Sequence, residues 1–224
     1  MDSQNENKLL RDALGMYAGE HVLEMILKDG EKALERFSND AELTLVFVDV
    51  LLYTENDLGF SSGKISEILG EYYEMLTRTV VSHDGIFDSF VGDSGSAFWG
   101  IDGKKSHPST ACSCAIDLAR EIDALNKNST KNNLPSIKLK IGINTGSVRL
   151  GNFGSSDRIK YTVMGGAINL ASRLCGLAFS DQSSTILISE MTRKRLISEI
   201  ETEHFDTVHV KGISEQIGIY KIAF

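Results

Sequence analysis

The stretch that decides the fold is Ile86-Phe-Asp-Ser-Phe-Val-Gly-Asp-Ser-Gly-Ser-Ala-Phe-Trp99. Two short apolar segments flank the Gly-Asp-Ser-Gly sequence of residues 92–95, whose composition is typical of a tight turn. The stretch therefore predicts a β-hairpin that carries Asp93 at its tip. A carboxylate between apolar strands is costly without a partner, so Asp93 is a candidate functional residue.

A second carboxylate lies upstream of the hairpin. Residues 43–50, Leu-Thr-Leu-Val-Phe-Val-Asp-Val, have the length and composition of a buried strand, and Asp49 lies near its end. Residues 64–83 then place apolar side chains at helical intervals, and we expect this helix to end near Gly85. The first 30 residues predict one or two amphipathic helices joined near Gly19.

Helices and strands also alternate downstream of the hairpin, with a turn expected at Asn144-Thr-Gly. The whole pattern predicts an α+β fold, an α/β sandwich with a central mixed, largely antiparallel sheet flanked by helices. The chain has 224 residues, enough for one substantial core. We expect further helices over residues 109–126, 166–179 and 190–200, and further strands over 137–143, 147–152, 185–189, 204–210 and 217–224.

Composition excludes several classes of function. The chain carries 23 Lys and Arg against 31 Asp and Glu, a net charge of −8, so we expect neither a nucleic-acid nor a membrane partner. The three cysteines lie in apolar stretches, which indicates reduced thiols and disfavours a disulfide framework or a zinc site. No apolar run approaches the ~20 residues of a membrane span and no signal peptide is evident, so a cytoplasmic location is expected.

Asp49 and Asp93 form the first candidate site. Each lies next to an apolar strand, where a divalent cation would offset the cost of an unpaired charge. Two carboxylates and a backbone carbonyl supply the oxygen ligands that Mg²⁺ or Mn²⁺ prefers when it also binds substrate phosphates. The alternative is that both residues are ordinary aspartates of strand ends and turns.

A second group of polar residues follows in Tyr161-Thr-Val-Met-Gly-Gly-Ala-Ile-Asn-Leu-Ala-Ser-Arg-Leu174. Asn169 and Arg173 are four residues apart in the expected helix, so both side chains can converge on one anion. Lys211, in Val-Lys-Gly, offers a third polar contact. The alternatives are a solvated helix face and an ordinary surface lysine.

These separated groups together resemble the catalytic domain of the class III nucleotide cyclases, the adenylyl and guanylyl cyclase homology domain. Residues 45–49 are similar to its first metal motif, residues 90–93 to its second, and residues 161–174 to its transition-state motif. Ile141-Gly-Ile-Asn-Thr-Gly and Val210-Lys-Gly also fit, in the family's order. The resemblance implies that residues 41–224 are a catalytic domain and that residues 1–40 are a helical extension.

The resemblance implies a role for each acidic residue. Asp49 and Asp93, with Val50, would bind two Mn²⁺ or Mg²⁺ ions, one helping to ionise the ribose 3′-hydroxyl and the other binding the triphosphate. The enzyme would then be a phosphorus–oxygen lyase that makes a 3′,5′-cyclic nucleotide and pyrophosphate from a nucleoside triphosphate.

The resemblance likewise assigns the polar residues. Asn169 would orient the ribose, while Arg173, Lys211 and Thr54 would bind the phosphates and stabilise their charge. In this family the site is shared across a head-to-tail homodimer, with the metal aspartates from one chain and Asn169, Arg173 and Lys211 from the other. The complete set in one sequence therefore implies two equivalent sites in a homodimer.

Three positions of the implied base pocket depart from purine-specific relatives or leave the base open. Ser89 stands four residues before Asp93, where those relatives usually have Lys or Glu, and Thr162 is compatible with several bases. Leu52 replaces a glycine, and Tyr53 adds a hydroxyl beside the pocket. The combination is similar to the pyrimidine cyclases of bacterial antiphage signalling systems (Pycsar), which make cyclic CMP or cyclic UMP for a separate effector.

UTP or CTP is therefore the expected substrate, and the sequence does not choose between them. One alternative is an adenylyl cyclase with relaxed base contacts, in which Tyr53 merely fills the core and Ser89 tolerates ATP. Another is a catalytically silent cyclase-like module that binds nucleotide or dimerises. The complete set of polar residues argues against silence, because a degenerate domain has no chemical reason to keep it.

Overall fold

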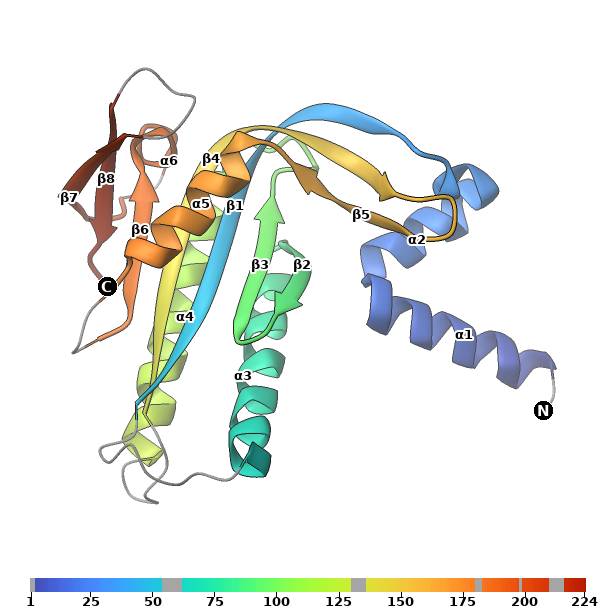
Figure 1. The fold of residues 1–224 in the computed structure, drawn as a ribbon, viewed down its shortest axis with the longest axis horizontal. Helices are drawn as coiled ribbons and strands as arrows, with labels where there is room; N and C mark the ends of the chain where they lie inside the picture. The colour runs from blue at the N-terminus through green and yellow to red at the C-terminus, as the bar shows by residue number, and fades with distance from the viewer. Residues whose placement is uncertain (1–2, 54–61, 130–135, 180–182, 198, 210–215) are drawn as a thin grey trace. The chain divides into compact units, whose positions relative to one another are not determined.

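The computed structural model describes residues 3–53, 62–129, 136–179, 183–197, 199–209 and 216–224 (Figure 1). In chain order, the helices and strands are α1 (Ser3–Ala18), α2 (Glu20–Asp29), the 3₁₀ helix η1 (Gly30–Leu34), β1 (Ser38–Tyr53), α3 (Ser62–Ser82), β2 (Ile86–Val91), β3 (Ser94–Trp99), α4 (His107–Ser129), β4 (Ser136–Gly154), β5 (Ile159–Met164), α5 (Gly166–Leu177), β6 (Thr185–Ser189), α6 (Glu190–Arg193), β7 (Thr202–His209) and β8 (Gln216–Ile222). None of the helices within the described residues is long and apolar enough to cross a membrane.

The chain divides into two compact units. The first comprises Met1–Ala41 and Val148–Gly165, and the second comprises Glu42–Ser147 and Gly166–Phe224. The helices of the first 40 residues thus share a unit with the outer part of β4 and with β5. The domain boundary expected at residue 40 stays a prediction.

The second unit is built on a mixed sheet with the strand order β2-β3-β1-β4-β6-β8-β7. β4 and β6 are parallel, whereas the β1–β3, β2–β3, β6–β8 and β7–β8 pairs are antiparallel. Figure 1 shows helices on both faces of this sheet. The expected mixed, largely antiparallel sheet flanked by helices is confirmed.

One face of the sheet packs against α3 and α4. Val46, Val48 and Val50 of β1 belong to this core together with Tyr72 of α3 and Leu118 of α4. Successive side chains of a strand point to opposite faces of its sheet, so the intervening residues of β1 project from the other face. This alternation places Asp49 away from α3 and α4.

α5 covers part of the opposite face. Leu170, Ala171, Leu174 and Cys175 form its buried side. A Cβ atom on Gly142 of β4 would overlap the backbone of Ala171 and Cys175, so only glycine allows the helix to lie this close to the strand.

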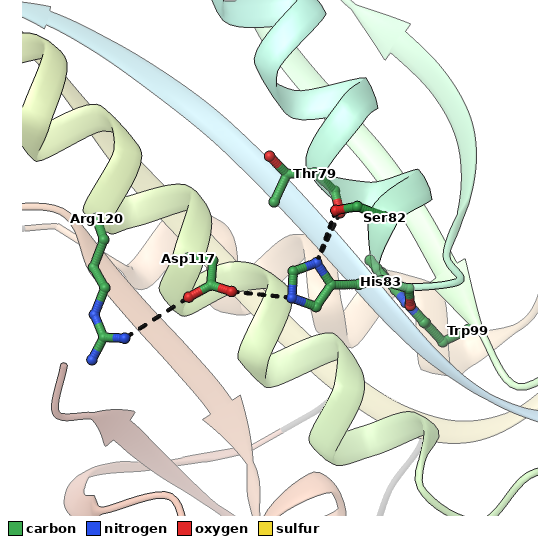
Figure 2. A network of polar contacts seen from close by, with 6 residues as sticks. All are labelled: Thr79, Ser82, His83, Trp99, Asp117 and Arg120. Carbon is green, nitrogen blue, oxygen red and sulfur yellow. Dashed lines mark hydrogen bonds and ion pairs between the residues drawn. The ribbon is translucent and has the colours of Figure 1, made fainter.

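α3 and α4 are joined by a polar network centred on His83, which Figure 2 shows. Its Nε2 atom lies 3.1 Å from Asp117 Oδ2 of α4, and its Nδ1 atom lies 3.0 Å from the Thr79 carbonyl oxygen. Arg120 Nη1 lies 3.8 Å from the other oxygen of Asp117. The Trp99 indole N–H donates to the His83 carbonyl at 2.8 Å, so the end of α3 is fixed to both α4 and β3.

The first unit has its own polar connections. The Asn152 side-chain amide of β4 donates to the carbonyl oxygens of Ala33 and Glu35, both at 2.8 Å. Arg149 donates to Ser38 and Asp40 at the start of β1. β5 pairs with β4 from Arg149↔Met164 to Gly154↔Ile159. These contacts fix η1 and the start of β1 to the β4–β5 ribbon.

The turn predicted at Asn144-Thr-Gly is wrong, because β4 runs straight through it. The Asn144 side chain is buried, donates to the Ala167 carbonyl at 2.9 Å and accepts from Ser189 Oγ at 2.6 Å. Thr145 Oγ1 lies 2.8 Å from Thr44 Oγ1. Partners from distant segments therefore override the local preference of Asn and Gly for a turn.

Other elements also differ from the sequence-based expectations. β1 begins at Ser38 rather than at residue 43, and β5 was not expected as a strand. The helix predicted over residues 190–200 ends at Arg193. The Ile197 N–H donates to Ser109 Oγ at 2.8 Å, which diverts this backbone group from a helical hydrogen bond.

All three cysteines are free and buried. Burial raises the pKa of Cys112 to about 12. Burial, together with the charges of Asp117 and Glu121, raises that of Cys114 to the same value. The pKa of Cys175 is also raised to about 12, mainly by burial and then by the charge of Asp49. All three side chains therefore remain neutral thiols at neutral pH.

Candidate active site

The Asp49 carboxylate has a partner on each oxygen. Ser94 Oγ of β3 donates to Asp49 Oδ1 at 2.9 Å, and Lys140 Nζ of β4 forms an ion pair with Asp49 Oδ2. The side chains of Asp49 and Lys140 are only 23% and 16% exposed, so solvent screens this pair less than it would an ion pair on the surface. The neighbouring strands β3 and β4 therefore fix the carboxylate from both sides.

Asp93 lies in the turn between β2 and β3 and is exposed. The preceding Gly92 has a φ of +62°, in the left-handed region that glycine favours. Val48 pairs with Gly95, and Ser94, which follows Asp93, bonds to Asp49. The turn and the end of β1 thus bring the two predicted metal residues to the same end of the sheet.

Both aspartates act on Lys140, which the sequence analysis did not single out. Burial alone would lower the pKa of Lys140, but the hydrogen bond and charge of Asp49, with a smaller contribution from Asp93, raise it. Lys140 therefore stays protonated as a cation paired with Asp49. The alternation of the strand does place Lys140. Its neighbours Leu139 and Ile141 are buried toward α3 and α4, so the Lys140 side chain lies on the opposite face of the sheet.

The carboxylates of Asp49 and Asp93 also affect the pKa of the buried Tyr72. Burial raises the pKa of its phenol well above the ordinary value, and the charges of Asp49 and Asp93 raise it further. Its hydroxyl has no hydrogen-bond partner within the part of the chain that the structure describes.

The donor set at Asp49 and Asp93 fits a hard divalent cation. Both residues offer carboxylate oxygens, and a cationic ammonium already lies on one of them. Among the described residues, no group of three or more His, Cys, Asp and Glu side chains could hold a metal ion. Backbone and substrate oxygens would have to complete the coordination, as is usual for Mg²⁺ bound with phosphates.

Two more predicted residues, Val50 and Tyr53, belong to the end of β1. The Val50 side chain is buried in the core, which leaves its backbone carbonyl as the group for a metal. Tyr53 is the last residue of β1. Thr54 lies outside the described residues.

Ser89, the predicted base-pocket residue of β2, belongs to a polar cluster on β2 and β3. Its hydroxyl donates to Asp88 Oδ2 at 2.9 Å and lies 3.1 Å from Ser96 Oγ. Ser96 also donates to Asp88 Oδ2, at 3.3 Å. Ser96 and Ser94 are two residues apart on β3, so this cluster lies on the same face of the sheet as the Asp49 contact.

Asn169 and Arg173 lie one turn apart on α5, and both are exposed. Arg173 Nη1 donates to the His209 carbonyl oxygen at 3.0 Å, at the end of β7. Lys211 follows two residues later and lies outside the described residues. Thr162, by contrast, belongs to the first unit, where it pairs with Gly151.

The predicted residues thus form two groups within one chain. In the part of the chain that the structure describes, the side-chain contacts of Asp49 are to Ser94 and Lys140, and that of Arg173 is to the His209 carbonyl. Among the described residues, no hydrogen bond or ion pair joins Asp49 to Arg173.

The sequence matches the family model described as the adenylate and guanylate cyclase catalytic domain over residues 36–223. It is 30% identical over 182 residues to adenylate cyclase 1 of Rhizobium meliloti, a match that covers 81% of this chain and 27% of that protein. It is 28% identical to the terminal-differentiation specific adenylate cyclase of Dictyostelium discoideum, covering 80% of this chain and 8% of that protein. The chain thus spans about a quarter or less of the length of these two relatives.

Solved structures agree with this match. The adenylyl cyclase CyaB from P. aeruginosa superposes with a TM-score of 0.75 at 28% identity, over 84% of this chain and 96% of that one. The guanylyl cyclase Cya2 gives 0.73 at 25% identity, over 83% and 93%. A bacterial light-regulated adenylyl cyclase shares the fold over 98% of this chain and 62% of its own, with a TM-score of 0.81 at 20% identity. The chain therefore belongs to the adenylate and guanylate cyclase catalytic domain family.

Proposed function

We propose that this chain converts a nucleoside triphosphate to its 3′,5′-cyclic monophosphate and pyrophosphate. One observation carries the proposal: Ser94, next to Asp93, bonds to Asp49, and both aspartates act on the Lys140 ammonium. This arrangement gathers the negative charge that a cation-assisted phosphoryl transfer requires.

Asp49 and Asp93, with the Val50 carbonyl, would hold Mn²⁺ or Mg²⁺ ions, two per site, which would make the ribose 3′-hydroxyl more acidic and offset phosphate charge. Asn169 would orient the ribose. Arg173, Lys211 and Thr54 would stabilise charge on the phosphates. Lys140 adds a cation at the same place, available to the triphosphate once Asp49 binds a metal.

We also propose that the active enzyme is a head-to-tail homodimer. The aspartates and the Asn169–Arg173 pair have separate contacts within the described part of one chain, and Asn169 and Arg173 are exposed. A second subunit would bring the two groups together at each of two equivalent sites. The isolated subunit should then be inactive.

For the base, we propose a pyrimidine, UTP or CTP. Ser89 is short, and its hydroxyl lies among the polar groups of Asp88 and Ser96 on the face that carries Asp49. Tyr53 and Thr162 are the other residues proposed for the pocket. The bulky, polar Tyr53 together with Ser89 would make the pocket smaller and offer hydrogen bonds to a single-ring base, and a wrong base would leave buried polar groups unpaired.

The product would act as a cytoplasmic second messenger for a separate effector in antiphage defence. A second candidate is an adenylate cyclase that makes cyclic AMP. It is favoured by the 30% identity to a relative named adenylate cyclase. A silent nucleotide-binding module is the third, and the full set of polar residues speaks against it.

One experiment tests these proposals. Purified protein is incubated separately with ATP, GTP, CTP and UTP in the presence of Mn²⁺ or Mg²⁺, and the products are identified by mass spectrometry. Asp49→Asn is the inactive variant, and Asp102→Asn, an aspartate paired with Lys104, is the matched control. Cyclic CMP or cyclic UMP is the expected main product. Cyclic AMP as the main product would refute the pyrimidine proposal, and pyrophosphate without a cyclic product would refute the cyclase.

A further inference from the structure

Tyr73 of α3 contacts the turn that carries Asp93. Its phenol Oη donates to the Gly92 carbonyl oxygen at 2.6 Å. The centroid of its ring lies 4.5 Å from that of the Phe90 ring, and the Phe90 centroid lies 4.3 Å from that of Phe87. α3 therefore contacts the β2–β3 hairpin through a hydrogen bond at the turn and through aromatic rings just before it.

This turn bears on both candidate metal residues. Asp93 follows Gly92 directly, and the next residue, Ser94, donates to Asp49 Oδ1 at 2.9 Å. A shift of the turn would therefore displace Asp93 and also loosen the hold on Asp49.

Burial alone restrains the turn weakly. Gly92 and Asp93 are exposed, and Val91 is 73% exposed. Exposed turns of this kind open easily unless a specific contact holds them. The Tyr73 hydrogen bond supplies such a contact one residue away from the carboxylate.

We propose that Tyr73 is a positioning residue that holds the Gly92–Ser94 turn in the geometry in which Asp93 and Asp49 bind a metal ion. The inference rests on the proposed function, because it assumes that these aspartates are the metal ligands. Partners that orient a metal ligand typically change metal affinity by about 10–100-fold when they are removed. Tyr73 reaches the ligand through the backbone, so we expect the lower end of that range.

The test is Tyr73→Phe, which keeps the ring contacts with Phe90 and removes only the hydroxyl. Mn²⁺ binding without nucleotide is followed by electron paramagnetic resonance of the free ion. We expect about tenfold weaker binding, with a matching rise in the Mn²⁺ concentration for half-maximal turnover. The KM for the nucleotide at saturating Mn²⁺ should stay unchanged, and excess Mn²⁺ should restore kcat.

Tyr72→Phe is the matched control on the same helix. It also removes one phenolic hydroxyl, but that hydroxyl is buried and has no hydrogen-bond partner among the described residues. Mn²⁺ binding should be unchanged in this variant. Thermal unfolding of both variants measures any general loss of stability.

The outcomes separate the inference from the function. If Asp93→Asn loses Mn²⁺ while Tyr73→Phe binds it like the wild type, the inference is wrong and the proposed metal site stands. Equal losses in both tyrosine variants, or a Tyr73→Phe defect that excess Mn²⁺ does not rescue, also overturn the inference. If Asp93→Asn itself binds Mn²⁺ and turns over normally, the metal role proposed for Asp93 fails; if the wild-type protein forms no cyclic nucleotide, the proposed function fails.

Discussion

The two groups of candidate residues differ in how the chain prepares them. Asp49 is half-buried, and β3 and β4 supply a hydroxyl and an ammonium to its two oxygens. Asn169 and Arg173 stand exposed on α5, where Arg173 has a backbone carbonyl as its partner. Fixed groups lose little freedom on binding, whereas exposed groups must still be ordered. The Asp49 carboxylate is therefore already held by its own chain, whereas the exposed side chains of Asn169 and Arg173 would still have to be ordered when a substrate binds.

We expect the largest effect from Asp49→Asn, which alters the carboxylate that β3 and β4 hold in place. Turnover should fall by about 10³-fold or more, because metal-ion catalysis supplies several kcal/mol of transition-state stabilisation. The measurement is the initial rate of cyclic-nucleotide formation together with Mn²⁺ binding. Activity close to that of the Asp102→Asn control would remove Asp49 from the mechanism.

Arg173→Ala removes the guanidinium from the exposed group of residues on α5. We expect kcat to fall by about 10²–10³-fold, as when other placed donors to a developing charge are removed. The free energy of unfolding should change little, because Arg173 is exposed. A large rise in KM at an unchanged kcat would instead assign Arg173 to substrate binding alone.

Mixing the two variants tests whether the groups meet across subunits. A heterodimer of an Asp49→Asn chain and an Arg173→Ala chain would have one intact site and one doubly altered site. Random pairing of equal amounts should restore about a quarter of wild-type activity. A heterodimer verified by differential tags that shows no recovery would contradict the shared site.

Lys140→Met removes the cation that is paired with Asp49. Mn²⁺ should bind about tenfold more tightly, because a positive charge in contact with Asp49 competes with the metal. Turnover should nevertheless fall, since the variant would lose the cation that we propose acts on the triphosphate. Lys138→Met, on the same strand, controls for the change in net charge. Weaker Mn²⁺ binding would show that Lys140 supports the metal site instead.

The smallest effect concerns stability alone. His107 Nδ1 lies 2.8 Å from Thr44 Oγ1, five residues before Asp49 on β1. Burial lowers the pKa of His107, with the charge of Arg195 contributing and those of Glu42 and Asp102 opposing. The unfolded state therefore binds a proton more readily, and stability should decrease as the pH falls through the ordinary histidine range near 6.5. Thermal unfolding against pH should show a flatter profile for His107→Gln.

The hairpin at residues 86–99 and the helix at 166–177 were predictable because their signals are local. Gly-Asp-Ser-Gly specifies a turn, and apolar residues at helical spacing specify the buried face of α5. The turn at Asn144 was wrongly predicted because its partners, Ser189 and the Ala167 carbonyl, come from distant parts of the chain. Tertiary contacts of this kind cannot be read from local composition.

The same reasoning applies to the site. Asp49 and Asp93 stood out as charges among apolar residues, whereas Lys140 did not, because its partner lies on a strand far away in the sequence. The Tyr73 contact was likewise hidden in a regular helical pattern. A charged residue among apolar neighbours can be recognised in the sequence. The residues that hold it in place can be identified only once the fold is known.

The three buried thiols have a practical consequence. With pKa values of about 12, they should react slowly with maleimides and other thiol reagents at neutral pH. A cysteine introduced at an exposed position of α5 could then be tagged selectively without first deleting the native ones. Paired spin labels or fluorophores placed in this way would report directly how two copies of the chain assemble.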